Sequence, residues 1–139
     1  KISLRAEEDA VVIANRTFME IALNNIIKNA AEAARSEVKI TLKSNPPVLP
    51  LIKGGEGGLF TKGGNEGITI EIDDDGSGID ENLQDKIFEP FVTTKADGTG
   101  LGLAIAYRII TSFGGNIMVD KSSLGGARFT IVFPAKRTE

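Results

Sequence analysis

The chain contains, in its last third, the stretch Gly98-Thr99-Gly100-Leu101-Gly102-Leu103-Ala104. The apolar run from Leu101 to Phe113 predicts a helix, and the pair Gly114-Gly115 predicts its end. Glycine lets the backbone approach a ligand closely, and a helix start offers free N–H groups and a partial positive charge. These properties predict an anion site, and phosphate is the anion that suits it best.

A second glycine turn lies upstream, Asp74-Asp75-Gly76-Ser77-Gly78. It follows a predicted strand over residues 68–72, and a carboxylate at Asp74 is suited to accept a hydrogen bond from an exocyclic amine such as that of adenine. The alternative is a solvated acidic turn, which Asp-Gly pairs usually form. A calcium loop starting at Asp73 is disfavoured, because Gln84 stands where such a loop needs a bidentate glutamate.

Two asparagines interrupt the apolar face of a helix that the sequence predicts over residues 16–34, with Asn15 as its N-cap. Asn25 and Asn29 lie four residues apart, hence one above the other. A buried amide without a partner costs on the order of 1–3 kcal/mol, so both side chains need one. Either they bond to a neighbouring loop, or their oxygens ligate a magnesium ion that is held mainly by phosphates.

The remaining patterns predict an α+β fold. Alternating residues predict strands over 1–4, 38–42, 68–72, 116–121 and 127–133, with a short helix over 81–87. This order fits a sandwich of helices on a sheet better than a doubly wound sheet. Residues 44–67, with three prolines and seven glycines, are expected to form a mobile loop insertion between two strands that can still pair.

Composition narrows the possible functions. With 139 residues, 41% hydrophobic and 25% charged, the chain fits one soluble globular domain. A net charge of -3 gives no reason to expect nucleic acid or an anionic membrane as partner. The absence of cysteine and histidine excludes disulfides, imidazole ligands and a phosphohistidine on this chain. We expect a cytoplasmic location without direct membrane contact, whether or not the parent protein is membrane-anchored.

In this order and spacing, the motifs resemble the ATP-binding catalytic domain of sensor histidine kinases, within the superfamily that includes gyrase, Hsp90 and MutL. The matching segments are residues 25–30 (Asn-Ile-Ile-Lys-Asn-Ala), 74–79 (Asp-Asp-Gly-Ser-Gly-Ile), 87–91 (Ile-Phe-Glu-Pro-Phe) and 98–103. The resemblance covers residues 1–139 apart from the 44–67 insertion. It implies a Bergerat ATP-binding fold, a two-layer α/β sandwich whose mixed β-sheet carries helices on one face.

The resemblance also implies roles for individual residues. Asp74 would bind the adenine amine, Asn29 would ligate magnesium with Asn25 close by, and residues 92–99 would form a lid that brings Lys95 to the γ-phosphate. Asn29 and Lys95 would be the catalytic residues. The residues implied to bind the nucleotide are Asn25, Asn29, Ala33, Asp74, Gly76, Gly78, Ile79, Thr94, Lys95, Thr99, Gly100, Leu101, Gly102 and Leu103. Ala127 departs from the pattern, because many relatives carry a hydroxyl there near the adenine.

One position favours a kinase over an ATPase. Hydrolytic members of the superfamily carry a glutamate four residues before the magnesium asparagine, and here that residue is Asn25. Without this base the γ-phosphate should pass to an external nucleophile. The resemblance implies a histidine on a separate dimerisation and phosphoacceptor domain of the same parent, with a response regulator as an indirect partner. An anti-sigma-type serine/threonine kinase and a non-catalytic ATP-sensing module remain as alternatives.

Overall fold

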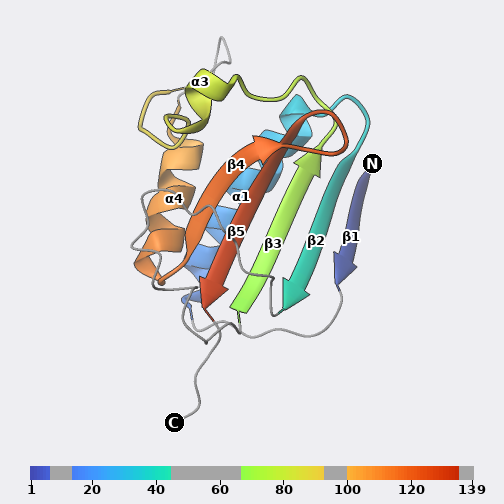
Figure 1. The fold of residues 1–139 in the computed structure, drawn as a ribbon. Helices are drawn as coiled ribbons and strands as arrows, with labels where there is room; N and C mark the ends of the chain where they lie inside the picture. Colours follow the sequence, from blue (N-terminus) through green and yellow to red (C-terminus); the bar gives the residue numbers. More distant parts are fainter. Residues whose placement is uncertain (7–13, 45–66, 93–99, 135–139) are drawn as a thin grey trace.

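A mixed β-sheet forms one layer of the computed structural model, which describes residues 1–6, 14–44, 67–92 and 100–134 (Figure 1). Within these residues the sheet has five strands in the order β1-β2-β3-β5-β4, with β1 parallel to β2 and every other pair antiparallel. The strands are β1 (Ile2–Ala6), β2 (Val38–Ser44), β3 (Gly67–Asp74), β4 (Asn116–Lys121) and β5 (Ala127–Pro134). The predicted mixed sheet, and the pairing of the strands that flank the insertion, are confirmed.

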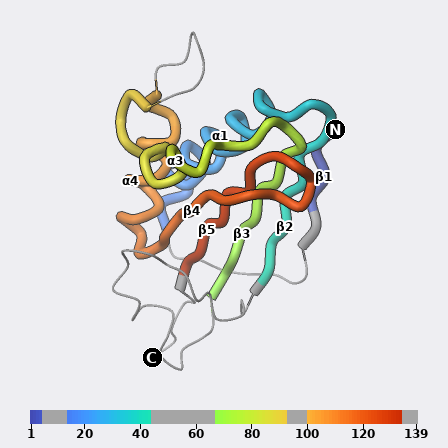
Figure 2. Tube along the Cα trace, turned by 45° about the horizontal axis from the view of Figure 1, so that its top comes forward, coloured from blue at the N-terminus to red at the C-terminus, as the bar shows by residue number. Residues whose placement is uncertain are grey.

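Two long helices lie on the same face of this sheet and form the second layer (Figure 2). Helix α1 (Arg16–Ala33) starts as predicted at Asn15, whose side-chain oxygen accepts the N–H of Phe18 at 3.0 Å. Helix α4 (Gly102–Ser112) packs against α1 and ends before Gly114, which has a φ of 84°. The α+β sandwich with helices on one face is therefore confirmed.

The core lies between the two layers. Its largest fully buried side chains include Ile26 of α1, Ile72 of β3 and Phe129 and Phe133 of β5. Burying a side chain of this size stabilises the fold by roughly 1.5–3 kcal/mol. The end of β3 next to this core is therefore firmly held, and Asp74 is its last residue.

Helix α3 (Glu81–Gln84) is shorter than the helix predicted over 81–87. Beyond it the N–H of Lys86 bonds to Leu83 and that of Glu89 to Lys86, which is turn geometry. Ile87, which follows in these turns, is buried in the core, so this segment packs inward without continuing the helix. The prediction was wrong in length, although the start at Asp80, which caps the helix, agrees with it.

The ends of the predicted insertion belong to strands, because β2 continues through Ser44 and β3 starts at Gly67. Residues 45–66 lie outside the described part of the chain, so the expectation of a mobile loop there stays a prediction. Among the described residues, no helix combines the length and apolar character needed to cross a membrane.

Candidate nucleotide-binding site

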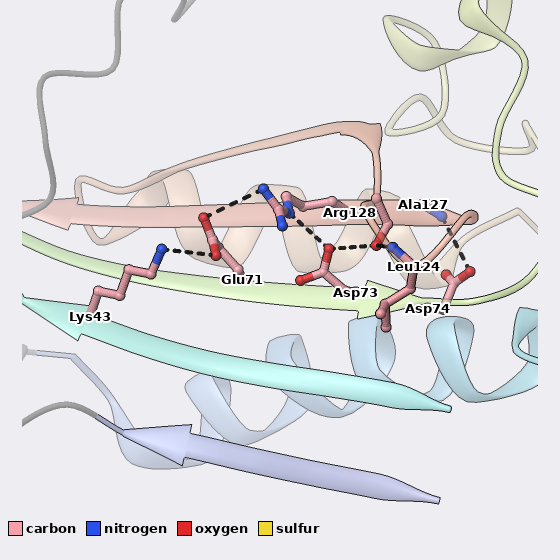
Figure 3. Close-up of polar contacts among 8 residues, drawn as sticks. Lys43, Glu71, Asp73, Asp74, Leu124, Ala127 and Arg128 are labelled. Carbon is pink, nitrogen blue, oxygen red and sulfur yellow. Dashed lines mark hydrogen bonds and ion pairs between the residues drawn. The ribbon is translucent and has the colours of Figure 1, made fainter. Parts of the chain in front are cut away.

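The centre of the site is the carboxylate of Asp74, which is only 1% exposed. Its Oδ1 accepts the N–H of Gly76 at 2.9 Å and the N–H of Ala127 at 3.2 Å. Figure 3 shows Asp74 facing Ala127 at the start of β5. Its Oδ2 is buried and has no hydrogen-bond partner among the described residues. Leaving a buried polar atom unpaired costs about 1–3 kcal/mol, and more for a charged group, so a donor from a ligand fits this oxygen.

Glycines bring three segments close to Asp74. A Cβ on Gly76 would collide with the carbonyl oxygen of Ala33, at the end of α1. A Cβ on Gly126 would collide with Asp74 Oδ1, and Gly78 takes a φ of 80° next to Gly126. The end of α1, the glycine turn and the β4–β5 turn therefore meet here, and only residues without a side chain allow this approach.

The structure brings together most of the adenine-side residues that the sequence predicted. Asp74, Gly76, Gly78 and Ala33 lie within this cluster, and the half-buried Ile79 follows it and packs against the core. Gly126 belongs to the same cluster but was not predicted. The pair before the last strand was visible in the sequence, yet only the fold places it against Asp74.

The geometry gives the calcium alternative no support, because the neighbouring carboxylates point to different partners. Asp73 Oδ1 accepts from Ser122 Oγ and Arg128 Nε, whereas Asp75 accepts from the segment that follows α1. No group of three histidine, cysteine or acidic side chains in the described residues is placed to hold a metal ion.

The predicted phosphate side lies at the start of α4. Leu101 is its N-cap residue and makes no side-chain capping hydrogen bond, and the N–H groups of a first helical turn are suited to bind an anion. Gly100 has a φ of 74°, and its carbonyl accepts the N–H of Phe91 at 2.9 Å. Phe91 itself takes a φ of 70°, an uncommon value for a non-glycine residue. Leu103 is buried and anchors this end of the helix.

Asn25 and Asn29 lie half-buried on α1, not fully buried as the apolar stripe predicted. Asn25 is close to the start of α4, because a Cβ on Gly102 would lie 3.9 Å from its Cγ. Neither side-chain amide has a hydrogen bond within the part of the chain that the structure describes. The loop-bonding alternative therefore finds no support there, and magnesium ligation stays a prediction. Thr94, Lys95 and Thr99 lie outside the described residues.

Comparisons with known proteins agree with this geometry. Residues 14–137 match the family model described as histidine kinase-, DNA gyrase B-, and HSP90-like ATPase. The chain is 37% identical to the signal transduction histidine-protein kinase AtoS of Escherichia coli K12, over 96% of this chain and 19% of AtoS. It is 36% identical to the sensory histidine kinase/phosphatase NtrB of Rhodobacter capsulatus, over 83% of this chain and 31% of NtrB. The chain thus spans less than a third of either relative.

Solved structures show the same relation. The nucleotide-free catalytic domain of histidine kinase ThkA superposes with a TM-score of 0.71 at 30% identity, covering 96% of this chain and 78% of that one. Full-length ShkA in complex with AMPPNP superposes with a TM-score of 0.73 at 26% identity, covering 100% of this chain and 26% of that one. The chain belongs to the histidine kinase-, DNA gyrase B- and HSP90-like ATPase family, as an ATP-binding catalytic domain of the sensor histidine kinase type.

Proposed function

We propose that this domain transfers the γ-phosphate of ATP to a histidine on a separate dimerisation and phosphoacceptor domain of its parent protein. The observation that carries the proposal is the unpaired Oδ2 of Asp74, which is buried where the end of α1, the glycine turn and the β4–β5 turn meet. The 6-amino group of adenine is a donor of the right kind for this oxygen, and we expect Gly76 and Gly78 to shape the surroundings of the base.

The phosphates would extend from this pocket toward α4. The backbone N–H groups around Gly100, Leu101, Gly102 and Leu103 would bind them at the helix start, where the helix dipole favours negative charge. Lys95, Thr94 and Thr99 would contribute from the 92–99 lid over the γ-phosphate. Catalysis here needs mostly positioning and electrostatic stabilisation of the transferred group.

Magnesium would be held by Asn29, with Asn25 close to it. Amide oxygens are hard ligands that suit this ion, and magnesium usually takes several of its ligands from phosphates and water. The half-buried amides without partners in the described residues, together with the nearness of Asn25 to Gly102, fit such a site. The ion would neutralise phosphate charge during transfer.

Asn25 of α1, whose side chain lies near the start of α4, favours phosphotransfer over hydrolysis. Asn25 lies next to Gly102, and a carboxamide cannot accept a proton from water as a glutamate does. The chain also has no histidine, so a phosphohistidine must form on another domain. The relatives named histidine kinases are several times longer than this chain, which leaves room for that domain in the parent.

A phosphotransfer experiment tests this proposal. The chain is incubated with radiolabelled ATP and magnesium, alone and with a helical domain that carries the parent's phosphoacceptor histidine. We expect very slow hydrolysis by the chain alone, and an acid-labile, base-stable label on the added domain. Rapid hydrolysis by the chain alone would contradict the proposal. An acid-stable phosphoester on a partner would indicate the serine/threonine kinase, and binding without any transfer would indicate the sensing module.

A further inference from the structure

Three consecutive aspartates lie at the end of β3: Asp73 and Asp74 are its last residues, Asp75 follows it, and the three carboxylates bond to different partners. Of the three, only Asp74 has a fully buried oxygen without a hydrogen-bond partner among the described residues. The two flanking carboxylates are engaged in hydrogen bonds that link β3 to segments distant in the sequence. Their partners explain what they do for Asp74.

Asp75 binds the segment that follows α1. Its Oδ1 accepts the backbone N–H groups of Arg35 at 2.8 Å, Ser36 at 3.0 Å and Glu37 at 3.1 Å, and its Oδ2 accepts Ser36 Oγ at 2.6 Å. Its own N–H bonds to the carbonyl of Glu37 at 3.3 Å. This tether holds the end of α1 against the glycine turn, where Gly76 touches the carbonyl of Ala33 and donates to Asp74 Oδ1.

Asp73 binds the β4–β5 turn on the other side. Its Oδ1 accepts Ser122 Oγ at 2.7 Å and Arg128 Nε at 2.8 Å (Figure 3). Ser122 in turn organises the turn, because its Oγ accepts the N–H of Leu124 and its N–H bonds to the carbonyl of Gly126 at 2.8 Å.

The same turn reaches back to Asp74. Gly126 donates its N–H to the backbone carbonyl of Asp74 at 3.1 Å, and Ala127 donates its N–H to Asp74 Oδ1 at 3.2 Å. Oδ1 therefore receives one donor from each side, Gly76 from the turn that Asp75 tethers and Ala127 from the turn that Asp73 tethers. With Oδ1 held by both donors, the carboxylate cannot rotate, and Oδ2 is fixed in direction.

We propose that Asp73 and Asp75 are positioning residues that hold the two walls around Asp74 and thereby set its selectivity for a purine with a 6-amino group. The inference rests on the proposed binding of adenine by Asp74. The hydrogen bonds from Ser36, Glu37 and Arg35 also lower the pKa of Asp75 below its usual range, so this tether stays ionised across the physiological range.

Selectivity between ATP and inosine triphosphate tests the proposal. Inosine carries an oxo group where adenine carries the amine, so it offers Asp74 an acceptor in place of a donor. Affinities of the 139-residue chain for both nucleotides are measured by calorimetry in the presence of magnesium. We expect Asp74→Asn to reduce the preference for ATP by at least about tenfold, the size of a lost charge-assisted hydrogen bond.

The two flanking aspartates should act in the same direction. We expect Asp75→Ala and Asp73→Ala each to reduce the ATP preference by about three- to tenfold, chiefly through weaker ATP binding. Arg128 keeps Glu71 as a partner at 3.9 Å in Asp73→Ala, so no lone charge is created there. Asp85→Ala makes the same change at an exposed aspartate and should leave the preference unchanged.

Milder variants keep the test decisive if the aspartate variants do not fold. Ser36→Ala removes only the 2.6 Å contact to Asp75, and Ser122→Ala removes the contact of Asp73 to the β4–β5 turn. Each should reduce the ATP preference by about twofold or more. Ser112→Ala, which removes a comparable side-chain hydrogen bond at the far end of α4, should not.

The outcomes distinguish the positioning role of Asp73 and Asp75 from the adenine contact of Asp74. Equal losses of ATP and inosine triphosphate in the Asp73, Asp75, Ser36 and Ser122 variants would overturn the positioning role, because a merely structural effect does not change selectivity. An unchanged preference in Asp74→Asn would instead contradict the proposed adenine contact itself. A lost preference in Asp74→Asn, with none lost in the flanking variants, would leave the proposed function intact and refute only the positioning role.

Discussion

The adenine side and the phosphate side of the site are built differently. Around Asp74, two hydrogen bonds to Oδ1 and glycines packed too closely for a side chain leave Oδ2 buried and unpaired among the described residues. At the start of α4, the helix lacks a side-chain cap, and Asn25 and Asn29 are half-buried amides without partners in the described residues. In the proposed binding mode, the adenine contact is already positioned in the free protein, whereas phosphates and magnesium would complete the other side.

The largest effect on this comparison should come from Asp74→Asn. The change removes the negative charge and puts an NH2 group, a donor, where Oδ2 offered an acceptor to the ligand. ATP affinity should therefore fall by about 10- to 100-fold, or roughly 1.5–3 kcal/mol. Calorimetric titration with ATP and ADP measures it, and thermal unfolding shows whether the fold is kept. Parent and variant with the same affinity would show that the base does not bind at Asp74.

The next largest effect should be a difference in stability between glycine substitutions on the adenine side and on the phosphate side. Gly76→Ala places a Cβ against the carbonyl of Ala33, so we expect a loss of stability of about 1–3 kcal/mol and weak ATP binding. Gly102→Ala is the matched change on the phosphate side, where the nearest atom is 3.9 Å from the new Cβ. Since alanine favours helices over glycine by up to about 1 kcal/mol, this variant should be as stable as the parent or more so.

Denaturant unfolding of both glycine variants, without nucleotide, measures the contrast. Destabilisation of the same size in both variants would mean that the adenine side is not more tightly packed than the phosphate side.

Asn29→Ala should affect magnesium rather than the fold. Because the amide has no partner in the described residues, its removal should change the free energy of unfolding by less than about 0.5 kcal/mol. The gain in ATP affinity on adding magnesium should shrink severalfold. Asn24→Ala, on the exposed face of the same helix, is the matched control. If the Asn29 variant kept the magnesium dependence of the parent, Asn29 would be only a structural amide.

The smallest expected effect is the loss, at acid pH, of the stability that the hydrogen bonds of Asp75 contribute. Its pKa is lowered in the folded chain by the hydrogen bonds from Ser36, so its contribution is fully present above the usual aspartate pKa of 3.8. As the pH falls below that value the unfolded chain takes up a proton first, and the contribution is lost. The difference in melting temperature between parent and Asp75→Ala should thus be constant near neutral pH and shrink below about pH 4.

Ser36→Ala should show a smaller difference with the same pH dependence, because it removes the largest cause of the lowered pKa. A difference between parent and Asp75→Ala that stayed the same down to about pH 3 would speak against the tether.

Local sequence signals predicted most of the fold. The cap at Asn15, the strand alternation and the glycine stop after α4 each act over a few residues, and each appears where it was expected. The position of Asp74 was also predictable, since a glycine turn after a strand is a local pattern, while its contact with adenine stays a prediction. The early end of α3 was not predictable, because the residues after Gln84 carry no glycine or proline stop until Pro90, although the structure turns there.

The hydrogen bonds that support Asp74 could not be predicted from the sequence either, because they join residues that are far apart in the chain. Asp75 bonds to Ser36, 39 residues away, and Asp73 bonds to Ser122, 49 residues away. Nothing in the spacing of a three-aspartate run indicates that the outer two serve the middle one. The burial of the asparagines was likewise overestimated, because an apolar stripe does not show which part of a helix face its neighbours leave uncovered.

A crystal structure of this chain with magnesium and a non-hydrolysable ATP analogue tests the central claim most directly. We predict that the 6-amino nitrogen of adenine lies within about 2.7–3.2 Å of Asp74 Oδ2, while Oδ1 keeps its bonds to Gly76 and Ala127. A base bound elsewhere, with Oδ2 still unpaired or bonded only to water, would contradict the account.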